Sequence, residues 1–228
     1  MEFIKIIDSV DNGLTYNARY LPEKYNKPIY NKFFNFAIKH YSITNRMIYL
    51  NSKINELWKE WEQSINEPHI NTNDKTSLIN SAILHKKWEE NLINSYYSKE
   101  EFIACLRKVV DECLILFCVA TQKFKNNGVP IDSIGEYLSK KIKKPDSIVR
   151  AFTAFTDFFV LLNDISNSYK HAIINCQFVI DKEAPGFDVY KTKHNQIDYH
   201  QGIHISLDEI IKKFNVFYNY FDKAIKNV

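Results

Sequence analysis

Apolar residues recur with the period of an α-helix along most of the chain. The segment from Pro28 to Glu67 fits one long helix or two shorter ones, because the stretch from Ser42 to Asn45 could interrupt its apolar face. Further helices are expected in four segments before the pattern changes, at residues 77–95, 99–126, 134–144 and 146–175.

Local capping signals place the predicted helix boundaries. Ser98 is followed three residues later by Glu101, which is the spacing of a capping box and predicts that a new helix begins at residue 99. Asp132 or Ser133 is expected to cap the helix at 134–144. Asp146 or Ser147, directly after Pro145, is expected to cap the aromatic helix that follows.

The pattern changes to short alternating runs after Asn175. The runs predict a β meander of two or three strands at residues 176–206. Ser206 or Asp208 then caps a last amphipathic helix. The expected fold is mainly α, a helical bundle of five or six helices with a small β meander before the C-terminal helix. We expect a single domain over 1–228, with its bundle core at 28–175, its meander at 176–206 and the helix at 207–228 packing back.

Charge and composition exclude few classes of protein. Thirty basic and 27 acidic residues give a net charge of +3, which permits RNA binding but does not require it. The four cysteines form no CxxC pair, the N-terminus has no secretory signal, and no apolar run reaches the roughly 18 residues of a membrane span. We therefore expect a soluble cytoplasmic protein with no membrane partner and no cofactor.

A polar stripe runs through the aromatic helix at 146–175. Asn163, Asn167, His171 and Asn175 are each four residues apart, so they share one helix face. His171 can exchange a proton near neutral pH, and Asn167 lies one turn before it. Lys170 lies on an adjoining face and could meet a phosphate. The alternative is a buried Asn–His hydrogen-bond network in a structural domain with no active site.

The stretch LNDISNSYKHAI, residues 162–173, resembles the HEPN superfamily (higher eukaryotes and prokaryotes nucleotide-binding domains). That family carries an Arg, a polar residue and, a few residues later, a His. In active members two copies face each other and cleave RNA without a metal. By this resemblance Asn167 matches the polar residue and His171 the histidine, whereas Ser166 stands where the Arg is expected.

The missing Arg favours a degenerate motif, and the resemblance then implies a dimerising binding module of a bacterial defence, stress or toxin–antitoxin system. The alternative is a metal-independent endoribonuclease with His171, Asn167 and Lys170 as catalytic residues. Ser166, Asn163 and Tyr169 are the expected substrate-binding residues. The expected partners are a second copy, joined through the helix at 146–175, and an RNA or a protein.

A second cluster lies in the predicted meander. Asp198, His200 and His204 would share one face of an extended strand, with His194 upstream. Such ligands suit a transition metal, but no close-spaced second pair completes the shell. We therefore interpret the cluster as a solvent-facing strand surface and predict no metal site.

Overall fold

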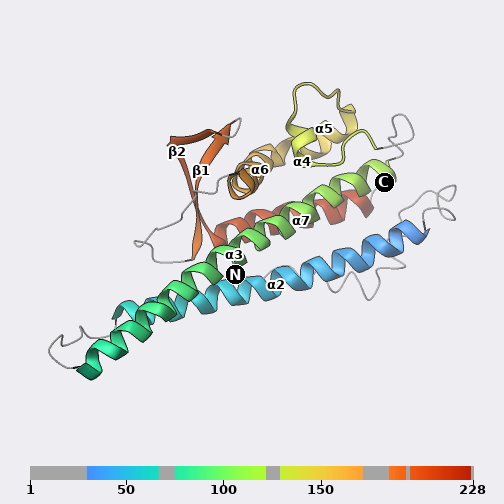
Figure 1. Ribbon diagram of the computed structural model, residues 1–228. Helices are drawn as coiled ribbons and strands as arrows, with labels where there is room; N and C mark the ends of the chain where they lie inside the picture. The colour runs from blue at the N-terminus through green and yellow to red at the C-terminus, as the bar shows by residue number, and fades with distance from the viewer. Residues whose placement is uncertain (1–29, 67–74, 122–128, 172–184, 194–195, 227–228) are drawn as a thin grey trace.

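The computed structural model describes most of the chain, at residues 30–66, 75–121, 129–171, 185–193 and 196–226. The fold of these residues is mainly helical with one two-stranded antiparallel sheet before the C-terminal helix, as predicted (Figure 1). No helix among them is both long and apolar enough to cross a membrane.

Two long helices, α2 (Tyr30–Asn66) and α3 (Lys75–Ala120), lie side by side and antiparallel (Figure 1). The segment predicted as one helix or two is therefore a single helix. The separate helices predicted at 77–95 and 99–126 are wrong, because α3 runs through Ser98 without a break. No Gly or Pro interrupts Lys75–Ala120, and Glu101 pairs with Arg46 of α2 at 2.6 Å. The expected stop at residues 126–128 lies outside the described residues.

The short helix α4 (Ile134–Leu138) is capped as predicted by Ser133, whose Oγ accepts a hydrogen bond from the Glu136 amide at 3.3 Å. It ends six residues earlier than expected because Ser139 adopts an extended conformation. Continuing the helix would bring the like charges of Lys140 and Lys144 one turn apart. Lys144 instead donates to the Ser139 carbonyl oxygen at 2.8 Å.

The aromatic helix is broken into α5 (Asp146–Phe152), the 3₁₀ turn η3 (Thr153–Phe155) and α6 (Thr156–His171). Thr153 Oγ1 donates to the Val149 carbonyl oxygen at 2.6 Å, a bond that bends helices. The predicted caps are also wrong, because Pro145 occupies the N-cap and Asp146 opens the first turn. Asn175 and the predicted first strand lie outside the described residues.

The sheet pairs β1 (Gly186–Lys193) with β2 (Gln196–Ser206). Ser168 Oγ of α6 lies 2.6 Å from the Tyr190 carbonyl oxygen of β1, which fixes the sheet to that helix. β2 leads directly into α7 (Leu207–Lys226), and Ser206 is its cap, because Ser206 Oγ accepts from the Glu209 amide at 3.1 Å.

Aromatic side chains dominate the core where α5 and α6 meet α7. Phe152, Phe159 and Phe217 are fully buried, and the rings of Phe159 and Phe217 are 5.4 Å apart in an edge-to-face arrangement. These contacts hold the inner face of α6 against α7. They leave another face of α6 to meet α3 and α4, where the polar residues gather.

Candidate functional site

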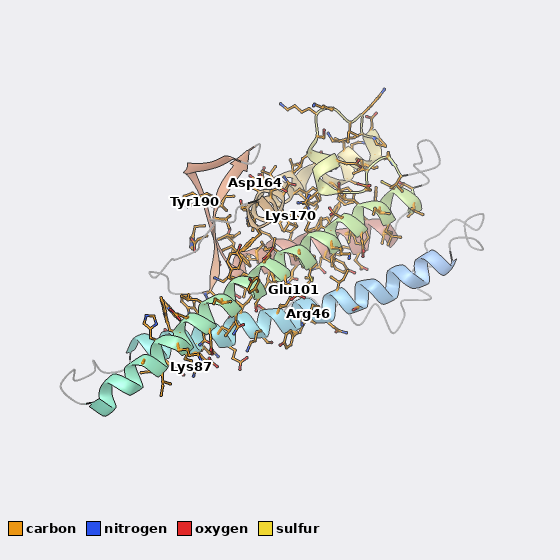
Figure 2. The ribbon with its side chains drawn as sticks, in the orientation of Figure 1. Arg46, Lys87, Glu101, Asp164, Lys170 and Tyr190 are labelled. Atoms are coloured by element: carbon orange, nitrogen blue, oxygen red, sulfur yellow. The ribbon has the colours of Figure 1, made fainter. Side chains whose placement is uncertain are left out.

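A cluster of polar side chains lies between α3, α4 and α6. Its residues, called here the α3–α6 polar cluster, are Arg107, Asp111, Asn163, Asn167 and Lys170. Figure 2 shows the α6 end of this region, with Lys170 labelled beside α3. The central contact is a hydrogen bond in which Arg107 Nη1 donates to Asn167 Oδ1 at 3.3 Å.

On α3 and on α6, residues four positions apart contribute to the cluster because they share one helix face. Arg107 and Asp111 are one turn apart on α3, and Arg107 Nε lies 3.8 Å from Asp111 Oδ2. Their side chains are only 15% and 22% exposed, so water screens this pair less than a surface pair. Asn163 and Asn167 are one turn apart on α6 and both are half-buried.

The α4 backbone covers the cluster from a third side. The Ile134 amide donates to Asp111 Oδ1 at 2.7 Å. A Cβ on Gly135 would lie 3.5 Å from Arg107 Nη2 and 3.9 Å from Asn163 Oδ1. The α4 backbone at Gly135 therefore lies next to the guanidinium group and the Asn163 amide.

Asp111 is the acidic member of the cluster. Burial raises the pKa of its carboxyl group, while the Ile134 amide and the charges of Arg107 and Lys170 act in the opposite direction. The nearby charge of Asp132 raises it further. Asp111 thus faces two cations in a place where its own charge is poorly solvated, and it competes with any external anion for them.

The residues predicted from the helix motif fall on different faces of α6. Asn163 and Asn167 belong to the cluster and Lys170 is exposed at its edge. Ser166 and Tyr169 are buried, and the Tyr169 ring packs 5.5 Å from the ring of Tyr96. Their burial leaves no open surface through which either side chain could contact a substrate in this structure.

His171, predicted as the proton-transfer residue, is the last residue of α6. Its backbone follows Asn167 by one turn, and its side chain lies outside the described part of the structure. The described geometry therefore brings together Arg107, Asn163, Asn167 and Lys170, and it leaves the position of the imidazole open.

Arg107 is the residue that sequence reasoning missed. It is separated from Asn167 by 60 positions, so no local motif joins the two. One signal could have drawn attention to it: Arg is scarce in this Lys-rich chain, and Arg107 lies on an apolar helical segment between Leu106 and Val109. A cation kept in such a place needs a polar partner.

In the β hairpin, His204 Nδ1 contacts Asp188 Oδ1. Among the side chains that the structure describes, no three His, Cys, Asp or Glu residues come together as metal ligands. The side chains of His194, Asp198 and His200, which the predicted cluster also contains, lie outside that part.

Comparison of the chain with protein-family models, with curated proteins and with solved structures found no match.

Proposed function

We propose that this chain is a HEPN-like module that binds RNA, and that the α3–α6 polar cluster contacts a phosphate group of the RNA backbone. One observation carries the proposal, the placement of the Arg107 guanidinium group against Asn167. The resemblance expects an Arg beside that polar residue, and the helix motif itself offers only Ser166 there. Arg107 brings a guanidinium group to the same asparagine from α3.

The chemistry of the cluster suits a phosphodiester. A guanidinium group is planar, always charged and able to donate two parallel hydrogen bonds to phosphate oxygens. The amide of Asn167 holds one of its nitrogens, which limits the rotation of the Arg107 side chain. Exposed Lys170 adds a second positive charge at the rim.

Further exposed lysines lie outside the cluster, between α4 and α5. The segment between α4 and α5 carries exposed Lys140, Lys141 and Lys143, and α4 contacts α6 beside the cluster. Exposed lysines contribute to the salt-dependent attraction between a protein and a nucleic acid. The homodimer through 146–175 and the bacterial defence or stress setting belong to the same proposal, and they rest on the resemblance.

Binding of a labelled single-stranded RNA, followed by fluorescence anisotropy, tests the proposal. We expect Arg107→Gln to weaken binding by about tenfold or more, because a hydrogen bond to a charged group is removed. Lys170→Gln should weaken it to a smaller extent. The matched control is Arg150→Gln, which removes the same charge from an exposed position on α5.

The outcomes separate the alternatives. Equal weakening by Arg107→Gln and Arg150→Gln would mean that only net charge matters. Absence of binding by the wild-type chain would favour a structural domain in which the cluster is a satisfied polar network. Thermal unfolding of each variant, followed by circular dichroism, shows whether a loss of binding reflects a loss of fold.

The position of Arg107 also supports a second candidate, a metal-independent endoribonuclease. A guanidinium group near Asn167 could stabilise the charge that develops when a 2′-hydroxyl attacks the phosphate, with His171 one turn away as general acid or base. Incubation with total RNA in the presence of a chelator tests this activity. The candidate requires cleavage by the wild type that both His171→Ala and Arg107→Gln abolish; cleavage that survives in either variant contradicts it.

A further inference from the structure

The N-terminal part of α3 projects with the C-terminal part of α2 beyond the sheet and the other helices (Figure 1). One side of α3 packs on α2 along this projection, while the residues on its opposite side are exposed. This arm therefore offers an open helix surface.

Large apolar side chains follow that open surface. Ile83, Ile93 and Tyr97 are 61%, 55% and 63% exposed. With Lys86 and Glu90 they recur at alternating spacings of three and four residues, which is the seam of a coiled coil. We call these five residues the α3 stripe. Scattered exposed apolar residues are ordinary, but an aligned set on one seam is typical of a surface that meets another helix.

The order of charges along the stripe identifies the partner. If two copies of α3 lie antiparallel about a two-fold axis level with Trp88, Ile83 of each copy meets Ile93 of the other. The same register sets Lys86 of each copy against Glu90 of the other. A parallel pairing in register would instead oppose Lys86 to Lys86 and Glu90 to Glu90, which repels. The stripe is thus complementary to itself in one orientation only.

We propose that two copies of this chain associate through antiparallel pairing of their α3 stripes. The isoleucine pairs remove apolar surface from water, and the Lys86–Glu90 pairs fix the register. This contact is separate from the one that the resemblance implies through the helix at 146–175, because the stripe lies wholly on α3. Self-association through the α3 stripe does not depend on the RNA site, since the two share no residue.

A single helix pair buries little area, so the association is expected to be weak and dependent on concentration. Sedimentation velocity over a concentration series measures it. We expect Lys86→Glu alone and Glu90→Lys alone each to weaken association by about fivefold or more, because like charges replace two opposite pairs. The double variant carrying both changes should restore association to the level of the wild type.

The control is Lys87→Glu, which reverses an exposed charge on α3 outside the stripe and should leave association unchanged. All these positions are exposed, so the variants should fold like the wild type. A wild-type chain that stays monomeric at the highest concentration would overturn the proposal. So would single variants that associate like the wild type, or a double variant that fails to recover.

Discussion

Individual side chains decide what the α3–α6 polar cluster can bind. Arg107 and Lys170 attract an anion, and Asp111 opposes it from within the same cluster. If the cluster binds a phosphate as proposed, the balance among these three charges sets its affinity. It can be shifted without removing the arginine.

Replacement of Asp111 tests this balance. Asp111→Asn keeps an oxygen that can accept from the Ile134 amide and removes the negative charge that faces Arg107. We expect RNA binding to become stronger by about threefold or more, since a charge at such distances acts through a partly dry medium. Anisotropy titrations measure the change. Asp157→Asn, an exposed acid on α6, is the matched control; unchanged or weaker binding by Asp111→Asn would contradict the account.

Part of the site could be predicted at this scale and part could not. The four-residue spacing placed Asn163 and Asn167 on one face correctly. The same geometry could have shown that Ser166 lies inward, because it continues the apolar row of Phe159, Leu162 and Tyr169. Arg107 could not be placed, because its contact with Asn167 exists only once α3 and α6 have packed.

At the scale of the elements, α3 shows how tertiary contacts overrule a local signal. A capping box needs the Glu carboxylate to turn back toward the backbone of its own helix. Glu101 instead accepts two hydrogen bonds at 2.6 Å from Arg46 of α2. Figure 2 shows the two labelled side chains between these helices. The bidentate pair uses the carboxylate to join α2 and α3, and Ser98 remains inside the helix.

This pair makes a small part of the stability dependent on pH. Hydrogen bonding to Arg46 lowers the pKa of Glu101 below its ordinary value of 4.5. A carboxyl group with a lowered pKa stabilises the fold fully above its unfolded-state pKa, and the contribution disappears as pH falls through the folded-state pKa.

The predicted loss of stability in acid can be checked with Glu101→Gln. Denaturant titration compares the free energy of unfolding of this variant with that of the wild type at several pH values. Because both side chains are about half exposed, the difference should stay below about 1 kcal/mol at neutral pH and vanish in acid. A difference that grows as the pH falls would contradict the assignment. Lys213→Gln, which breaks the exposed pair with Glu209 within one helix, shows the effect expected of an ordinary surface pair.

At the scale of the whole molecule, the fold class could be predicted: mainly helical, with a small sheet before the last helix. The prediction was possible because the periodicity of apolar residues is a property of each segment alone. In α7 the predicted apolar face is buried in full: Ile210, Ile211, Phe214, Phe217, Tyr218, Phe221 and Ile225. The arrangement of the elements could not be predicted, because it depends on contacts between distant segments. The attachment of the sheet to α6 through Ser168 and the closure of α4 over Arg107 are two such contacts.

The salt dependence of RNA binding tests the central claim most directly, because it reports how many phosphate groups a protein neutralises. For single strands the slope of log affinity against log salt concentration changes by about 0.7 for each phosphate that is no longer neutralised. We predict that Arg107→Gln makes the slope shallower by about 0.7 and that Arg150→Gln leaves it as in the wild type. A slope unchanged in Arg107→Gln, or changed equally in both variants, would show that the α3–α6 polar cluster does not hold a phosphate.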